Sequence, residues 1–388
     1  NFVNYFESQR ERKTIKRIVK IFREKSESHI ENNITNTKQY ETNSWVDDRD
    51  KILDTIWFLD DELTFRYNFV KSFLDEEKKH PRPRHSLQFF KTLNSIINSI
   101  NLLEMRGRDS LGLCFQFVLE LNEANLEWYK TTEIEKHFLS AIVGSKIVIH
   151  AIYRTFNRIG VLGQNSKEVL HQLRADKAIM DLIKSGRYDS ISIVAHTRWA
   201  SVGLVNQQNI HPLINLTKTS DQIPTILSFV NGDIYNYKEI INTAKQKGNL
   251  SVDDTICTTD CLAIPVSLVG KKNMNMEKIA TKMLTEFTGS FVISIQHTAY
   301  SESILIAKKG IQGLYIGFSD DGIMFASDVY GLIETCRYFY PIKSGSIFSI
   351  SKEAQVYNEN FNFMGKSFDD EYMPVRFKVD PKGKFEDY

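Results

Sequence analysis

Three positions along the chain carry side chains that could bind an amino acid, each beside a segment with a clear secondary-structure pattern. Arg198 and the pair Asn231-Gly232 follow segments that alternate like β-strands, and loops at strand ends commonly display binding groups. The guanidinium of Arg198 offers a planar set of donors that suits a carboxylate. The amide of Asn231 and the backbone N–H of Gly232 could stabilise a developing oxyanion. Asp260, at the start of a predicted helix, could accept hydrogen bonds from an ammonium group.

Each of these residues also has a common structural role. Asn-Gly after a strand is typical of a hairpin turn, and an aspartate before a helix is typical of an N-cap. An arginine next to a tryptophan, as in Arg198-Trp199, often forms a surface stack. Their occurrence together, in one order along one chain, favours a shared site.

The bulk composition excludes several classes of protein. The chain has 388 residues, 42% of them hydrophobic, which is enough for at least one large core. Its 49 basic and 48 acidic side chains nearly cancel. No overall field therefore attracts nucleic acid or an anionic membrane, and we expect neither as a partner, although a local patch is compatible with this balance.

The four cysteines do not have the pattern of a disulfide framework or of a zinc site. We expect buried free thiols in a reducing compartment, with no metal and no cofactor. No apolar run approaches the roughly 18 residues of a membrane span, and the chain does not open with a secretory leader. These features predict a cytoplasmic protein.

Residues 1–85 are charged, poor in glycine and predicted to be mainly helical. Apolar residues recur at helical spacing, as in Ile15, Ile18 and Phe22. A loop is expected at 32–44 and a break at 81–84. The basic residues at 10–17 are diluted by later acidic ones, which favours a solvated helix face over a nucleic-acid stripe. A role in oligomer contacts or in docking a partner protein stays open for this region.

The pattern changes after the helix expected at 87–104, where strand-like runs dominate. Helical stretches are predicted at 121–148, 237–247, 260–268 and 276–287, and strands at 113–118, 190–195, 225–230, 290–295, 303–307, 313–317, 323–326 and 346–350. Many strands with few helices indicate an α+β fold of antiparallel sheets covered by helices.

The ordered peptides resemble the glutaminase half of isomerising glutamine–fructose-6-phosphate aminotransferases, the glucosamine-6-phosphate synthase family of class II glutamine amidotransferases. The family's His-Thr-Arg-Trp-Ala-Thr-x-Gly, Asn-x-His-Pro and Asn-Gly-x-Ile-x-Asn-Tyr segments correspond to 196–203, 209–212 and 231–237. Further similar segments are 103–112, 258–260, 325–328 and 384–388. The resemblance spans roughly residues 86–388. It departs at Ser201, where the family has threonine, and at Val202, where it often has histidine.

The resemblance implies an αββα Ntn-hydrolase sandwich at 86–378, with a helical insertion or extension at 1–85 and, at 379–388, the start of a linker to an absent C-terminal domain. It implies that glutamine is hydrolysed to glutamate and that the ammonia passes to a sugar-phosphate acceptor. Arg198 would bind the glutamine carboxylate and Asp260 its ammonium group, while Asn231 and Gly232 form the oxyanion hole. Trp199, Ser201 and His211 would complete the pocket wall. The implied partners are glutamine and a C-terminal sugar-isomerase-type domain, through which the protein would form a homo-oligomer.

One element of the family's chemistry has no counterpart in the sequence, namely an N-terminal cysteine whose own α-amino group serves as base. The first residue here is Asn1, and Cys114 falls where the family has an ordinary strand residue. Either a nucleophilic cysteine precedes Asn1, which we favour because the pocket residues are kept, or the domain binds without catalysis in a regulatory or scaffold role. A third alternative is an asparagine synthetase-like amidotransferase, which the segment Tyr235–Tyr237 permits.

Overall fold

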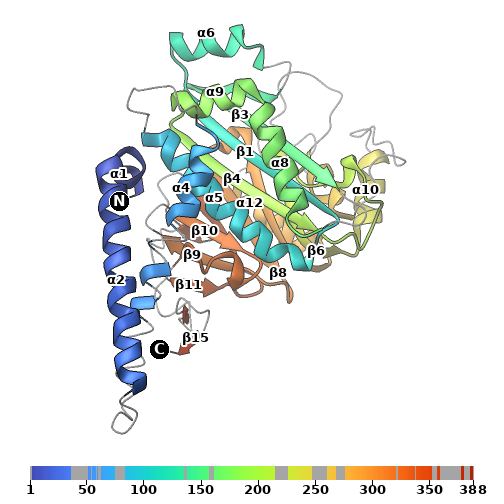
Figure 1. The fold of residues 1–388 in the computed structure, drawn as a ribbon. Helices are drawn as coiled ribbons and strands as arrows, with labels where there is room; N and C mark the ends of the chain where they lie inside the picture. The colour runs from blue at the N-terminus through green and yellow to red at the C-terminus, as the bar shows by residue number, and fades with distance from the viewer. Residues whose placement is uncertain are drawn as a thin grey trace. The chain divides into compact units, whose positions relative to one another are not determined.

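We analysed a computed structural model of the chain. It describes residues 2–35, 51–53, 55–57, 59, 63–74, 84–134, 138–156, 161–214, 226–246, 260–267, 276–319, 322–336, 338–351, 356–358, 377–379 and 385–387. The chain divides into two compact units, one made of residues 1–94 with 184–186 and the other of residues 95–183 with 187–388. Figure 1 shows the elements of both. The loop predicted at 32–44 and the break predicted at 81–84 fall largely outside the described residues, but residues 32–35 are helical rather than part of a loop.

The first unit is helical, as predicted. Its elements are α1 (Phe2–Glu7), α2 (Gln9–Thr35), α4 (Leu63–Lys71) and the first half of α5 (Arg84–Leu103). Tyr67 of α4 is the centre of its packing, because the rings of Tyr5 and Phe6 lie 6.0 and 5.1 Å from it and the guanidinium of Arg12 lies 4.9 Å from its centroid. Aromatic rings and one cation–π contact therefore hold α1, α2 and α4 together.

The second unit begins with a four-stranded antiparallel sheet. Its strand order is β2-β3-β1-β4, with β1 at Ser110–Glu120, β2 at Leu139–Val143, β3 at Lys146–Phe156 and β4 at Ser190–Arg198. The helices α8 (Gln164–Ala175) and α9 (Lys177–Ser185) follow β3 and lie over its outer face in Figure 1. Each has an apolar side at helical spacing, so each buries one face on the sheet.

A six-stranded antiparallel sheet is stacked on the first. Its order is β13-β12-β8-β7-β6-β5, with β5 at Leu213–Ile214, β6 at Ile226–Ile234, β7 at Gly289–His297, β8 at Ser303–Lys309, β12 at Ile347–Ser351 and β13 at Val356–Asn358. Buried side chains from both sheets form one cluster, which includes Cys114, Val194 and Phe229. The other face of this sheet buries α11 (Ala263–Ser267) and α12 (Met276–Glu286), with α10 (Tyr237–Gln246) packed alongside. These layers confirm the predicted αββα sandwich of two antiparallel sheets.

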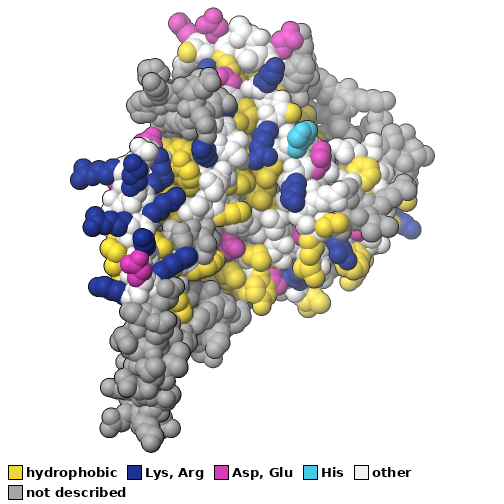
Figure 2. Space-filling model, in the orientation of Figure 1, with side chains coloured by type: hydrophobic (Ala, Val, Ile, Leu, Met, Phe, Trp, Pro, Cys, Tyr) yellow, Lys and Arg dark blue, Asp and Glu magenta, His cyan; other side chains and the backbone are white. Residues whose placement is uncertain are grey.

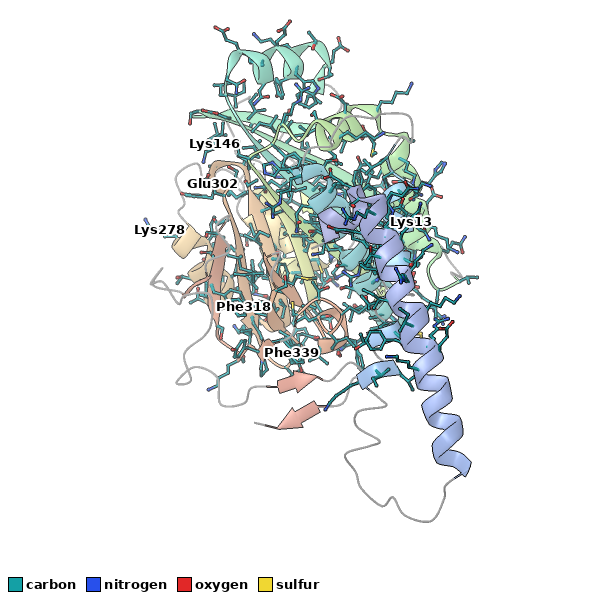
Figure 3. All side chains as sticks on the ribbon, turned by 60° about the vertical axis from the view of Figure 1, so that its left-hand side comes forward. Lys13, Lys146, Lys278, Glu302, Phe318 and Phe339 are labelled. Atoms are coloured by element: carbon teal, nitrogen blue, oxygen red, sulfur yellow. The ribbon has the colours of Figure 1, made fainter. Side chains whose placement is uncertain are left out.

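A third sheet has the order β10-β9-β11-β14-β15. Its strands are β9 (Tyr315–Ser319), β10 (Gly322–Ala326), β11 (Tyr338–Pro341), β14 (Phe377–Val379) and β15 (Phe385–Asp387). Phe318 and Phe339, labelled in Figure 3, belong to β9 and β11. The segment predicted as the start of a linker thus contributes β15 to a strand pair with β14.

The predicted helix at 121–148 is wrong over most of its length. Among its described residues, α6 (Glu123–Thr131) is the main helical element, with Asn122 as its N-cap, and a hairpin of β2 and β3 follows at 139–156. Gly144, at φ +60°, lies in the hairpin turn. The Gly-Ser pair between two short apolar runs was the signal for this hairpin.

Candidate functional site

Arg198 ends β4, and its guanidinium is held by the loop that follows it. Its Nη2 donates to the carbonyl oxygen of Val202 at 2.5 Å and its Nη1 to that of Leu204 at 3.4 Å. The side chain is 5% exposed. The loop therefore folds around the arginine fork, which fixes both the loop and the direction in which the remaining N–H groups point.

Asp109, just before β1, fixes the backbone of the same loop. Its N–H donates to the carbonyl of Arg198 at 3.0 Å, and its carboxylate accepts from the N–H of Ala200 at 2.9 Å. Gly107 makes this approach possible, because a Cβ there would lie 2.8 Å from the carbonyl carbon of Arg198. The segment at 103–112 thus serves as a support for the arginine loop.

Ser201 joins this loop to the end of β6. Its hydroxyl donates to the carboxylate of Asp233 at 2.9 Å. Trp199, two residues earlier, is exposed, with 70% of its surface accessible. The structure therefore brings the two peptides at 196–203 and 231–237 into direct contact, whereas Trp199 stands at the surface of the loop.

Asn231 and Gly232 lie within β6 rather than in a hairpin turn. They are paired with Val292 and Phe291 of β7. Gly232 has φ +115°, and a Cβ there would lie 2.1 Å from the carbonyl oxygen of Ser290. Only glycine fits this place, since both the backbone conformation and the neighbouring strand exclude a side chain.

Asp260, in the short helix η4 (Asp260–Leu262), is buried and touches the end of β6. Its carboxylate accepts from the N–H of Ile234 at 2.7 Å and from the thiol of Cys261 at 3.4 Å. Two hydrogen bonds, one from Ser201 to Asp233 and one from Ile234 to Asp260, therefore join the loop after Arg198 and the helix that begins at Asp260 to the end of β6, the strand that contains Asn231.

Two histidines, His196 in β4 and His211, lie near Arg198. The centroids of their rings are 4.1 Å apart, and the ring planes are inclined at 60°. Burial and the charge of Arg198 lower the pKa of His196 to about 4, although a backbone hydrogen bond with Val230 acts against this. Burial, followed by the charges of His196, Arg198 and Arg154, lowers the pKa of His211 well below its usual value. Both imidazoles are therefore neutral near pH 7.

Two further contacts belong to this region and were not predicted from the sequence. The guanidinium of Arg106 and the carboxylate of Asp328 form an ion pair at 2.7 Å, and Asp328 also caps η6 (Val329–Gly331). The buried carboxylate of Glu104 accepts from the N–H of Gly163 at 2.6 Å and from the side-chain amide of Asn165 at 3.3 Å. Both join segments more than fifty residues apart, so local spacing carried no signal for them.

The described cysteines lack the features of a nucleophile. Cys114, Cys261 and Cys336 are buried and form no disulfide, as predicted. Burial raises the pKa of Cys336 to about 12 and that of Cys114 still further. A thiol needs thiolate character and access to react. Cys257 lies outside the described residues.

The described part of the chain contains no group of three or more histidine, cysteine, aspartate or glutamate side chains that could hold a metal ion. Within the same residues, no helix combines the length and the apolar character needed to cross a membrane.

Comparison with known proteins gives three findings. A family model described as a glutamine amidotransferase domain matches residues 202–334. The glutamine–fructose-6-phosphate aminotransferase (isomerizing) of Buchnera aphidicola subsp. Baizongia pistaciae is 28% identical over 54% of this chain and 33% of its own length. That of Helicobacter pylori is 27% identical over 52% of this chain and 32% of its own length. The B. subtilis glutamine phosphoribosylpyrophosphate amidotransferase aligns over 70% of this chain and 47% of its own, with 13% identity and a TM-score of 0.45.

The sandwich fold and these matches define the chain as one that contains a glutamine amidotransferase domain. It is a class II domain, related to those of the glutamine–fructose-6-phosphate aminotransferases. The chain spans about a third of the length of these relatives.

Proposed function

We propose that this domain hydrolyses glutamine to glutamate and ammonia, and that the loops around Arg198, Asn231 and Asp260 form its glutamine site. The observation that carries the proposal is the pair of hydrogen bonds joining Ser201 to Asp233 and Ile234 to Asp260. They join the loop after Arg198 and the helix at Asp260 to the end of β6. A guanidinium and a carboxylate are the groups that complement the α-carboxylate and the α-ammonium group of an amino acid.

The roles of the individual residues follow from this placement. Arg198 binds the carboxylate of glutamine and Asp260 its ammonium group, while the amide of Asn231 and the N–H of Gly232 stabilise the oxyanion. His211, together with Trp199 and Ser201, completes the wall of the site. Since His196 and His211 are neutral, they add no charge to the site.

The proposal assigns the nucleophile to a cysteine that precedes Asn1. None of the three described cysteines qualifies, because all three are buried. An N-terminal cysteine carries its own base, as an α-amino group has an unperturbed pKa near 8. The ammonia acceptor is proposed to be a sugar phosphate bound by a C-terminal isomerase-type domain, on the strength of the relatives' names.

Two measurements on the natural full-length protein test this proposal. Glutamate release from glutamine gives the activity, and titration calorimetry with glutamine gives the binding. Replacement of Arg198 by lysine keeps the charge and removes the planar fork, so binding should weaken at least about tenfold. Arg108→Lys, at an exposed position beside β1, is the matched control and should bind normally. Equal binding by both variants contradicts the site. If the unmodified protein binds glutamine but releases no glutamate, the result supports the glutamine site and contradicts the proposed hydrolysis.

A further inference from the structure

We propose that the helical first unit is a membrane-docking surface, which binds anionic lipid bilayers through α2. This inference is independent of the glutamine site. It rests on charge, exposure and shape in the first unit alone. Over residues 9–25, which lie within α2, eight side chains are basic and two are acidic, although the whole chain is nearly neutral.

The basic side chains of α2 form a continuous stripe. Lys13, Lys16, Arg17 and Lys20 follow the spacing i, i+3, i+4, i+7, which places them on one face of a helix. All four are exposed. Figure 2 shows dark-blue side chains gathered along the described half of this helix, and Figure 3 labels Lys13 among them. An anionic surface is the complement of such a stripe.

An apolar stripe of the same spacing lies on nearly the opposite face of the helix. Its members are Ile15, Ile18, Val19 and Phe22. Val19 is buried within the protein, whereas Ile18 is 38% and Phe22 41% exposed, and Ile21 between the two stripes is 41% exposed. The helix thus buries one edge of its apolar face, at Val19, and leaves the other edge, at Ile18, exposed, with Ile21 between that edge and Arg17 of the basic stripe.

Other helical pieces of the same unit add exposed apolar side chains. Trp57 is 53% and Phe65 55% exposed, and Ile52 and Leu53 are exposed too. Figures 1 and 3 both show the short helical pieces at 51–53 and 55–57 running beside α2. Monomeric proteins do not usually combine so many exposed large apolar groups in one small unit. Tryptophan and phenylalanine beside lysine and arginine are typical of helices that lie in a membrane interface.

The observations favour a bilayer over the two other anionic partners. RNA would account for the basic stripe and could stack on aromatic rings, but it gives no reason to expose Ile18, Ile21 and Leu53. An acidic protein would need a surface shaped to fit the outer faces of helices. A bilayer requires no such shape, because its lipids rearrange around apolar side chains while its head groups pair with lysine and arginine.

The test is co-sedimentation of the full chain with large unilamellar vesicles. We expect binding to phosphatidylcholine vesicles that contain about a third phosphatidylserine, and not to phosphatidylcholine alone. Raised salt should weaken it, since screening shortens the range of the attraction. Each basic side chain near such a surface contributes about fivefold to partitioning. Neutralising all four stripe residues, as in Lys13→Gln, Lys16→Gln, Arg17→Gln and Lys20→Gln, should therefore reduce it at least about a hundredfold.

Two further variants make the test specific. The matched control changes four lysines of the second unit and should bind as the parent does: Lys130→Gln, Lys167→Gln, Lys177→Gln and Lys278→Gln. Ile21→Gln with Phe22→Gln removes two of the exposed apolar side chains of α2, keeps every charge, and should also weaken binding to vesicles. Circular dichroism confirms that each variant is folded. The proposal is overturned if the parent does not bind anionic vesicles, or if the control loses as much vesicle binding as the stripe variant. It is also overturned if the apolar variant binds as tightly as the parent, because charge alone would then explain the binding.

Discussion

Gly112 shows how a single absent side chain positions the candidate site. A Cβ at Gly112 in β1 would lie 1.6 Å from the carbonyl oxygen of His211. We expect Gly112→Ala to displace the His211 loop and to reduce glutamine hydrolysis about a hundredfold, because a shift of the order of 1 Å has that effect on a positioned site. Steady-state kinetics measure the loss of hydrolysis, and urea unfolding measures any accompanying loss of stability.

Gly144→Ala is the matched control for this change. Gly144 lies in the turn between β2 and β3 at φ +60°, and a Cβ there meets nothing within 4 Å. Gly144→Ala should lower the free energy of unfolding by about 1 kcal/mol, because alanine is strained at a positive φ, and it should leave the kinetics unchanged. If Gly112→Ala behaved like this control, the contact with His211 would not position the site.

The single buried carboxylate of Glu104 stabilises the start of a helix. It accepts from the N–H of Gly163, which precedes α8, and from Asn165. Glu104→Gln removes an anion from the positive end of α8 and should lower the free energy of unfolding by about 1–2 kcal/mol. Glu127→Gln, on the exposed side of α6, should change it by less than about 0.5 kcal/mol. Urea unfolding of both variants tests this. Equal changes in the free energy of unfolding would mean that Glu104 does not stabilise the start of α8.

At the level of elements, the sequence predicted the strands of the second sheet better than the connections between them. The runs at 290–295 and 303–307 alternate clearly and became β7 and β8. The segment 139–156 was missed, because its near-continuous apolar run resembles a buried helix as much as a strand. The site followed the same rule. Arg198 and Asp260 were identified by type, but the contacts of Asp109 and Asp233 join segments far apart in the sequence, which no local pattern records.

The two sheets are also joined by polar contacts inside the sandwich. The amide of Gln296 in β7 donates to the hydroxyl of Ser192 in β4 at 2.8 Å, and that of Gln116 in β1 donates to the carbonyl of Ser301 at 2.6 Å. These buried amides fix the register of the sheets where an apolar core alone would allow sliding.

A double-mutant cycle measures the first of these contacts. Gln296→Leu and Ser192→Ala should each destabilise the protein, and their effects should fall short of additivity by about 1 kcal/mol. Urea unfolding of the four proteins gives the coupling. Full additivity would mean that Gln296 and Ser192 do not interact in solution.

At the scale of the whole molecule, buried histidines make the sandwich sensitive to acid. Burial lowers the pKa of His150 to about 3 and those of His196 and His297 to about 4. His150 is further held by the amide oxygen of Gln116, at 3.0 Å from its Nε2. The unfolded chain therefore binds more protons than the folded one between pH 6.5 and 4. The contribution of these neutral histidines to the free energy of unfolding is fully present above pH 6.5 and is lost as the pH falls through this range.

His297 allows this to be tested with one substitution. Its Nδ1 accepts from the N–H of Ala299 at 3.0 Å, at the start of η5 (Thr298–Tyr300), and asparagine can accept the same bond without titrating. At pH 8 the imidazole is neutral in both states, so the parent and His297→Asn differ only by packing. As the pH falls from 6.5 to 4, the parent should lose up to about 1.4 kcal/mol per pH unit more than the variant, and about 3 kcal/mol in total. Urea unfolding across this range measures both curves. Parallel curves would mean that His297 is protonated as readily in the folded protein as in the unfolded chain, which its burial between the strands and η5 argues against.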